Sequence, residues 1–384
     1  MRTNPVLDEL GEYPIAVVQQ RARRLRESGH RVIDFSIGDP REPTPPFIAD
    51  TMRAAVPEVS QYPVTGGTAD LRNAVAGYLA RRFGVEVDPE TQILPTSGSK
   101  EAVFSTPLAF VDRSAGDVVA FGTPGYPIYE RGARFAGAVV HEVVLGDDFV
   151  LRAADVPHDV RSRLRLLWTC NPHNPTGAVT TSFELSGLLE LTRASDALLL
   201  SDECYADLYE ADAFPAGPPS VLQVSGPGSV GALAYLSCSK RSGMTGYRIG
   251  AIVGDPSAIA ALRRLRSATG TVPSEFTQAA AAAAWGDDDH AAERREVFAR
   301  KRLLLRKAFD EVGIATVASQ AGLYLWVAVG DDLEVTNRLL EAGVVVSPGR
   351  FFGPGGEGHL RLALVPTVDE CEAAVEILQG CLRP

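Results

Sequence analysis

The sequence has no long apolar run. None of its 384 residues lies in a stretch approaching the roughly 20 apolar residues that a membrane-spanning helix needs. The first residues, MRTNPVLDELGEY, also have no apolar core of the kind a secretory signal peptide carries. The sequence therefore predicts a cytoplasmic protein without a membrane partner.

Basic residues are fewer than acidic ones. Lysine and arginine number 37 against 48 aspartates and glutamates, which gives a net charge of −11. A protein of this charge repels nucleic acid and anionic membranes, so we expect neither as a partner. Two basic clusters, at residues 21–26 and 301–307, are interpreted as solvated faces of helices; the second contains Lys301, Arg302, Arg306 and Lys307.

Cysteines are few, and their spacing fits no metal site. The five thiols form an odd number and show no C-x-x-C pairing, which favours reduced side chains packed as small apolar groups: Cys170, Cys204, Cys238, Cys371 and Cys381. The acidic run Asp287 to His290 is interpreted as the start of a helix, where acids are favourable. We expect no bound metal.

The length and the order of apolar segments predict two lobes. Strand-like and helix-like segments alternate between residues 93 and 253, which is typical of an α/β fold with a mostly parallel sheet between helices. We predict an extended N-terminal arm over 1–14, in which Pro5 and Pro14 prevent a helix. A large domain is predicted over 46–285, and a smaller α+β domain over 15–45 with 286–384.

Three apolar strands are followed by polar residues of distinct chemistry. Asn174 lies in CNPHNPTG after residues 164–168, Asp202 ends the run ALLLSD, and Lys240 follows residues 232–236 in SCSKRSGMTGYRIG. Open α/β sheets bind ligands at the carboxyl ends of their strands, so we expect these side chains to meet at one edge. A lysine without nearby carboxylates in sequence, when desolvated, is a good Schiff-base former.

Three further positions suggest ligand contacts. The loop Ser97–Ser99 opens a predicted helix, and free backbone N–H groups there favour an anion. Tyr126 follows a rigid Pro-Gly turn and is placed to stack on a planar ring. Arg361 lies within the apolar stretch LRLALV, where a guanidinium needs a partner such as a ligand carboxylate.

These motifs together resemble those of the class I and II aminotransferases, which are fold type I pyridoxal phosphate enzymes. The resemblance extends from the IGDP turn to the LRLALV strand. It implies that Lys240 carries the cofactor as a Schiff base, that Asp202 pairs with the ring nitrogen, and that Tyr205 assists as the third catalytic residue. The remaining predicted cofactor contacts are Ser99, Lys100, Tyr126, Asn174, Ser237, Ser239 and Arg248.

The same resemblance implies a substrate site and a homodimer. Gly38, Asn174 and Arg361 are expected to receive the substrate carboxylate, and Tyr62 is expected to reach the cofactor phosphate of a neighbouring subunit. The active site would then lie at a subunit interface. Residues that read the distal end of the substrate stay open among Tyr13, Arg131, Tyr324 and Arg350.

The resemblance implies transfer of an amino group between an amino acid and a 2-oxo acid. Bacterial N-succinyldiaminopimelate aminotransferases share the segments SIGDP, GSKEA, YPIYE and SKRSGMTGYRIG, which suggests N-succinyl-LL-diaminopimelate with 2-oxoglutarate. The alternative is a pyridoxal phosphate enzyme of specialised metabolism that performs elimination, replacement or carbon–carbon bond formation. A regulatory sensor domain and a cofactor-free relative are less favoured, because no DNA-binding segment fits ahead of residue 15 and both Lys240 and Asp202 are present.

Overall fold

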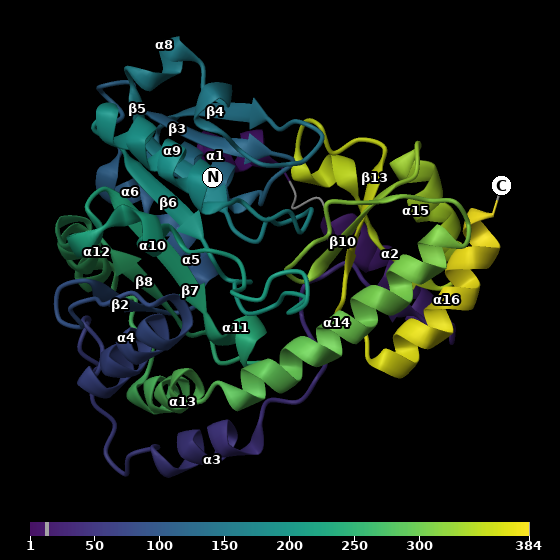
Figure 1. Ribbon diagram of the computed structural model, residues 1–384, viewed down its shortest axis with the longest axis horizontal. Coiled ribbons are helices and arrows are strands. Elements are labelled where there is room, and N and C mark those ends of the chain that lie inside the picture. Colours follow the sequence, from purple (N-terminus) through teal and green to yellow (C-terminus); the bar gives the residue numbers. More distant parts are fainter. Residues whose placement is uncertain (12–14, 384) are drawn as a thin grey trace.

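A computed structural model describes residues 1–11 and 15–383. Its elements group into two bodies, which we call the large lobe and the small lobe, each built around its own sheet (Figure 1). The large lobe contains a seven-stranded sheet and the small lobe a four-stranded one.

The large-lobe sheet is mostly parallel, as predicted. Its strand order is β2-β8-β7-β6-β5-β3-β4, and β8 alone runs opposite to the other strands of the sheet. The strands are β2 (Ile93–Thr96), β3 (Val118–Thr123), β4 (Val139–Val144), β5 (Leu164–Cys170), β6 (Leu198–Asp202), β7 (Ala232–Ser237) and β8 (Gly250–Gly254). All residues of β2, β3, β7 and β8 are buried, which explains why these segments are continuous apolar runs in the sequence.

Helices cover both faces of this sheet and enclose two apolar cores. One core includes Leu71, Leu188 and Ala281, and the other includes Val103, Ala133 and Leu262. The helices of this lobe are α3 (Pro46–Ala54), α4 (Ala69–Phe83), α5 (Ser99–Ser105), α6 (Pro107–Phe110), α7 (Ile128–Ala136), α8 (His158–Arg161), α9 (Ser182–Ala194), α10 (Val221–Ser225), α11 (Cys238–Arg241), α12 (Pro256–Thr269) and α13 (Glu275–Gly286), with short 3-10 turns at Ala153–Asp155 and Pro227–Ser229.

The small lobe joins segments from both ends of the chain. Its antiparallel sheet has the order β12-β13-β10-β9, and β1 pairs in parallel with β11. The strands are β1 (Ile33–Asp34), β9 (Thr316–Val317), β10 (Tyr324–Ala328), β11 (Val344–Val345), β12 (Ser347–Pro348) and β13 (His359–Ala363), and the helices are α2 (Ile15–Glu27), α14 (Asp289–Asp310), α15 (Asp332–Glu341) and α16 (Val368–Leu382), with a 3-10 turn at Gly349–Phe352. Within the described residues no helix has the length and apolarity to cross a membrane.

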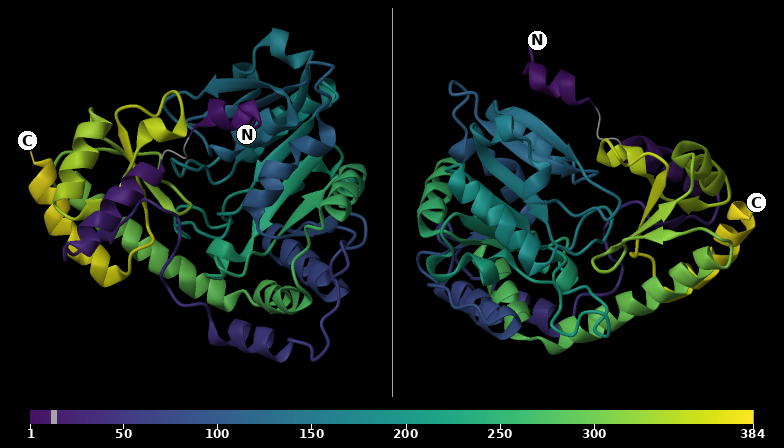
Figure 2. Two further views of the ribbon diagram at one scale, coloured as in Figure 1. Left: turned by 180° about the vertical axis from the view of Figure 1, so that it is seen from behind. Right: turned by 45° about the horizontal axis from the view of Figure 1, so that its top comes forward.

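The N-terminal arm differs from the prediction. Residues Pro5–Leu10 form the short helix α1, whose residues are not buried and which lies at the outside of the molecule (Figure 2). The reason is that Pro5 occupies the first helical turn, where its missing N–H costs no hydrogen bond, and Asn4 caps the helix by accepting from the Val6 amide. Pro5 therefore begins a helix, and Pro14 lies outside the described residues.

The prediction that the basic cluster on α14 is solvated is wrong for two of its residues. Lys301 and Arg302 are fully buried, while Arg306 and Lys307 remain accessible. Helix α14 runs from α13 in the large lobe to α16 in the small lobe (Figure 1), so one of its faces is covered by other elements. Lys301 pairs there with Glu42, and Arg302 donates to the carbonyl oxygen of Gly322. Burial is possible because each charge finds a polar partner.

Candidate active site

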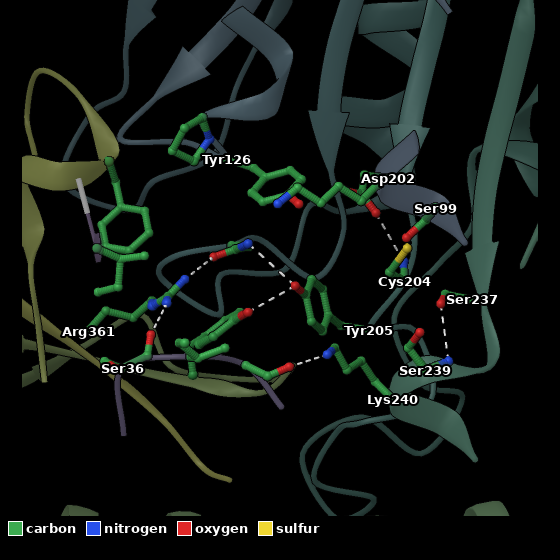
Figure 3. Close-up of a pocket in the computed structure, with 18 of the residues that line it drawn as sticks. Ser36, Ser99, Tyr126, Asp202, Cys204, Tyr205, Ser237, Ser239, Lys240 and Arg361 are labelled. Carbon is green, nitrogen blue, oxygen red and sulfur yellow. Dashed lines mark hydrogen bonds between the residues drawn. The ribbon is translucent and has the colours of Figure 1, made fainter. Parts of the chain in front are cut away.

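The polar residues at the strand ends line one pocket of about 430 Å³. The large lobe contributes residues that follow β2, β5, β6 and β7, and the small lobe contributes residues beside β1, β10 and β13 (Figure 3). Every predicted catalytic, cofactor and substrate residue except Tyr62 lines it: Gly38, Ser99, Lys100, Tyr126, Asn174, Asp202, Tyr205, Ser237, Ser239, Lys240, Arg248 and Arg361.

Lys240 lies on the short helix α11, directly after β7. The helix begins there because the Ser237 hydroxyl accepts a hydrogen bond from the Ser239 amide at 3.1 Å. The Nζ atom of Lys240 points into the pocket and donates to the carbonyl oxygen of Gly38. Burial lowers the pKa of Lys240 to about 8; Asp39 opposes this shift, and the guanidinium of Arg248 adds to it. The amine is thus closer to its neutral, nucleophilic form than an ordinary lysine.

Asp202 ends β6 and is almost completely buried. Its carboxylate accepts two hydrogen bonds, from the Tyr129 hydroxyl at 3.1 Å and from the Cys204 amide at 3.3 Å. Burial raises the pKa of Asp202, and no ion pair to it occurs among the described residues. A buried carboxylate at a pocket wall without a cationic partner is suited to a positively charged ligand atom.

Asn174 and Arg361 meet across the boundary between the lobes. The Nη1 atom of Arg361 donates to Asn174 Oδ1 at 3.0 Å, and its Nη2 atom donates to the Ser36 carbonyl oxygen at 2.6 Å (Figure 3). Its Nε atom is buried and has no hydrogen-bond partner within the described residues. The guanidinium therefore has capacity left for a carboxylate in the pocket.

Tyr205 lies beside Asn174 in the same group of side chains. Asn174 Nδ2 donates to the Tyr205 hydroxyl at 3.4 Å, and the hydroxyls of Tyr205 and Tyr324 are 3.0 Å apart. Burial raises the pKa of Tyr205 well above its ordinary value, so this phenol stays protonated.

The opposite end of the pocket is cationic and rich in hydroxyl groups. Ser99, Ser237 and Ser239 line it together with Lys100 and Arg248. Burial lowers the pKa of Lys100, and the neighbouring guanidiniums of Arg248 and Arg131 add to the effect. Like charges gathered at one place favour an anionic ligand between them.

Two glycines allow close approach at this pocket. Gly98 has φ of +89°, and a Cβ there would run into the Arg248 guanidinium. A Cβ on Gly38 would lie 2.6 Å from the Tyr324 hydroxyl oxygen. Neither position accepts a larger residue without a shift of its neighbour.

Tyr62 is the one predicted contact outside this pocket. Its side chain is fully exposed, with a relative accessibility of 100%. Its predicted role concerns the pocket of a second subunit, so the role stays a prediction.

The four candidates for the distal substrate group have different surroundings. Tyr324 lines the pocket, and Arg131 lies in an adjacent hollow where it donates to the Leu10 carbonyl oxygen at 3.3 Å. Arg350 is held by Asp332 through several hydrogen bonds, including Nε to Oδ1 at 2.9 Å. Tyr13 lies outside the described residues.

Several residues in or beside the pocket were not among the predicted site residues. Ser36 contributes a backbone oxygen, which any residue could supply, and Tyr129 reaches Asp202 from helix α7. Ile15, Phe351 and Phe352 form apolar walls on the small-lobe side. Tyr129 and Ser36 each had a local clue, since Tyr129 lies in the same YPIYE segment as Tyr126 and Ser36 lies in the SIGDP segment.

Comparisons with known proteins agree with this geometry. The family model described as aminotransferase class I and II matches residues 30–378. An LL-diaminopimelate aminotransferase of Aquifex aeolicus is 34% identical over 381 residues, which is 97% of each protein. A crystal structure of an aminotransferase from Neisseria meningitidis superimposes with a TM-score of 0.92 at 30% identity, over 99% of this chain and 100% of that one. A probable N-succinyldiaminopimelate aminotransferase from Thermus thermophilus gives a TM-score of 0.89 at 28% identity, over 96% and 100%.

Proposed function

This chain belongs to the class I and II aminotransferase family, and from that premise we propose how its own residues divide the work of transamination. The fold is that of the fold type I aminotransferases, and enzymes of this family use pyridoxal 5′-phosphate. The observation that carries the proposal is the convergence of an amine, a buried carboxylate and a buried guanidinium on one pocket, from Lys240, Asp202 and Arg361.

The residues present fit this cofactor. The absence of a side chain at Gly98 leaves room for the Arg248 guanidinium at the pocket. This guanidinium, the hydroxyls of Ser99, Ser237 and Ser239, and the ammonium of Lys100 together suit a phosphate group. Asp202, buried without a cationic partner among the described residues, suits a protonated ring nitrogen. Tyr126 lines the same pocket and is proposed to cover the ring.

We propose that Arg361 binds the α-carboxylate of the substrate through its unpaired Nε side, and that Asn174 holds the guanidinium in place. Gly38 lets the chain approach the carboxylate closely. Two buried hydrogen bonds to Arg361 reduce its freedom before the substrate arrives, which lowers the entropic cost of binding.

When bound, pyridoxal phosphate would supply an aldehyde carbon to receive the amino group and an electron-withdrawing ring that makes the α-proton of the substrate easier to remove. Lys240 is proposed to hold the cofactor covalently and then, as a free amine, to remove the proton from the α-carbon of the substrate. Asp202 keeps a proton at the ring nitrogen, and Tyr205 donates from its neutral hydroxyl into the pocket. The lowered pKa of Lys240 suits both of its tasks near neutral pH.

We further propose an amino acid of the diaminopimelate type as amino donor, with 2-oxoglutarate as the acceptor. Support comes from relatives named LL-diaminopimelate aminotransferase and probable N-succinyldiaminopimelate aminotransferase. A screen of half-reactions tests it: LL-diaminopimelate, its N-succinyl derivative and common amino acids are each added to the holoenzyme, and the change in cofactor absorbance is followed. Release of a 2-oxo acid over many turnovers without any acceptor would instead indicate an elimination or replacement reaction.

Replacement of the central lysine tests the proposed chemistry. Lys240→Ala is expected to lose turnover by more than about a thousandfold, because both covalent attachment and proton transfer are removed. After dialysis it should retain little cofactor absorbance. Lys307→Ala, which changes an exposed lysine on α14, serves as the control and should behave as the unmodified protein does. Undiminished activity in Lys240→Ala would refute the assignment.

We also propose a homodimer in which Tyr62 completes the partner's site. The exposed tyrosine lies in a segment with three further exposed apolar side chains, at Val56, Val59 and Val64. Sedimentation gives the assembly state. Tyr62→Phe should weaken cofactor binding about fivefold if its hydroxyl contacts the phosphate of a neighbouring subunit. A monomer with unchanged cofactor affinity in Tyr62→Phe would contradict the proposal.

A further inference from the structure

Tyr324 lies at the meeting point of the residues that hold substrate and cofactor, yet its sequence context assigns it no definite role. It is the first residue of β10 in the small lobe, and its side chain is 3% exposed. Its hydroxyl lies 3.0 Å from that of Tyr205 in the large lobe, and its ring supports the Arg361 guanidinium at 4.4 Å from the ring centroid. The Tyr324 side chain thus contacts both Tyr205, on the proposed cofactor side of the pocket, and Arg361, on the proposed substrate side.

The direction of the hydrogen bonds follows from the neighbours. A guanidinium can only donate, so the atom of Asn174 that faces Arg361 must be the amide oxygen. The amide nitrogen of Asn174 then faces Tyr205 and donates to its hydroxyl oxygen. This uses one of the two acceptor lone pairs of Tyr205 and leaves one lone pair and one proton.

The bond between the two tyrosines decides where that proton goes. If Tyr205 donated to Tyr324, its only hydroxyl proton would be used in that hydrogen bond and could not reach a ligand. If Tyr324 donates, both lone pairs of Tyr205 are filled and its proton is directed into the pocket. Resting on the proposed function above, we infer that Tyr324 donates to Tyr205 and is the positioning residue that makes Tyr205 a hydrogen-bond donor to the bound cofactor.

The backbone around Gly38 supports this arrangement. A Cβ at Gly38 would lie 2.6 Å from the Tyr324 hydroxyl, so only glycine leaves that hydroxyl its place beside Tyr205. The same glycine's carbonyl oxygen accepts from Lys240. The Tyr324 hydroxyl is therefore confined between Tyr205 and the Gly38 segment, and its ring between Tyr205 and Arg361, where the two tyrosine rings meet edge to face at 5.4 Å.

The test is the Tyr324→Phe variant, which removes one oxygen atom and keeps the ring under Arg361. A donor strengthened by Tyr324 favours the more negatively charged, deprotonated state of the lysine and cofactor together. The holoenzyme's visible absorbance is titrated against pH without substrate. Loss of this donor should raise the midpoint of that titration, which corresponds to a rise in proton affinity of about twofold to tenfold. The kcat should fall about fivefold, while KM for the amino acid changes less than about twofold, because the support of Arg361 is retained.

A double variant and a control make the result decisive. In a Tyr205→Phe background, the further change Tyr324→Phe should leave the absorbance midpoint where it is, because its effect passes through Tyr205. Tyr235→Phe is the matched control. It removes a buried tyrosine hydroxyl that does not line this pocket and that lies 2.8 Å from the Thr106 hydroxyl. This variant should not move the midpoint. Melting temperatures confirm that all variants are folded.

Two outcomes overturn the inference. One is a Tyr324→Phe enzyme with the absorbance midpoint and kcat of the unmodified protein. The other is an equal shift in the presence and absence of the Tyr205 hydroxyl. Both leave the proposed function intact, provided that the unmodified protein binds pyridoxal phosphate and transaminates. An unmodified protein that develops no pH-dependent cofactor absorbance would refute the proposed function instead.

Discussion

Individual charges in this protein are governed by burial. Burial lowers the pKa of Lys240 to about 8 and raises that of Asp202, the two groups proposed to act on the cofactor. The same cause acts on Glu203, next to Asp202, which we assign to structure. One carboxylate oxygen of Glu203 accepts from the Val221 amide at 2.8 Å, and the other has no partner among the described residues.

Glu203 makes a pH-dependent contribution to stability. Burial raises its pKa from 4.5 to about 7. Hydrogen bonds from the Ser220 hydroxyl and the Val221 amide lower the pKa and so reduce the effect of burial. As the pH rises past 4.5, the unfolded state releases this proton while the folded state keeps it. The free energy of unfolding therefore falls between about pH 4.5 and pH 7, and above pH 7 this group causes no further loss. The cost at pH 8 is on the order of 3 kcal/mol.

Glu203→Gln should therefore stabilise the protein at pH 8 by about 2 to 3 kcal/mol, because an uncharged amide still accepts from Val221. The gain should vanish near pH 4. Melting temperatures measured at both pH values check this. Glu86→Gln, at an exposed position, should change stability by less than about 0.5 kcal/mol at either pH. A gain of equal size at pH 4 and pH 8 would contradict the explanation.

Two short helices position residues of the active site. Helices α5 and α11 both begin at the pocket, directly after β2 and β7, so their first residues lie at the carboxyl ends of strands. Their start points are set by local backbone chemistry. Ser237 caps α11, and Gly98 precedes α5 with a positive φ that a residue with a side chain adopts only at a cost.

Gly98→Ala separates the pocket role of this glycine from backbone strain. The added methyl would displace the Arg248 guanidinium, so we expect cofactor affinity to fall by about tenfold, or roughly 1.4 kcal/mol. Gly84→Ala is the control, because Gly84 ends α4 with φ of +65° and a methyl group added there would meet no heavy atom within 4 Å. Gly84→Ala should lose about 1 kcal/mol of stability. Gly98→Ala should lose more, because its φ/ψ of 89° and 153° is adopted almost only by glycine. Only Gly98→Ala should weaken binding in an absorbance titration of the apoenzyme. Equal affinities would show that Gly98 has no role in shaping the site.

At the scale of the whole molecule, a buried ion pair holds the segment that leads to the large lobe against the small lobe. Lys301 on α14 pairs with Glu42, which lies in the segment between β1 and α3, and it also donates to the Leu364 carbonyl oxygen at 3.2 Å. The division of the chain into 46–285 and 15–45 with 286–384 remains our proposal, and this ion pair lies near its first boundary.

Removal of this lysine should destabilise the fold strongly. Lys301→Ala leaves the largely buried Glu42 with only the more distant Arg294, at 3.9 Å, as a cationic partner, and we expect a loss of about 3 kcal/mol. Lys307→Ala on the same helix changes a lysine that is 74% exposed and pairs loosely with Glu311, so its effect should stay below about 0.5 kcal/mol. Thermal unfolding compares the two. Similar melting temperatures for both variants would mean that the buried pair contributes little.

The pocket residues of the large lobe were predictable from the sequence for a physical reason. Asn174, Asp202 and Lys240 each follow an apolar strand, and parallel strands bring their carboxyl ends to one edge. The turn and strand patterns are local, so they are visible without knowledge of the fold. The N-terminal arm shows the limit of local reasoning, because Pro5 is compatible with both a helix start and an extended chain.

Contacts between distant segments were decided by the tertiary structure alone. Arg361 and Asn174, Tyr324 and Tyr205, and Lys301 and Glu42 are each separated by more than a hundred residues and come from different lobes or from the segment that joins them. Whether a charged residue on a helix is solvated or buried depends on what packs against its face, and no local pattern records that neighbour. The sequence by itself determined which chemical groups the strand ends present, and only the packing of the small lobe against them decided which groups meet and how each is charged.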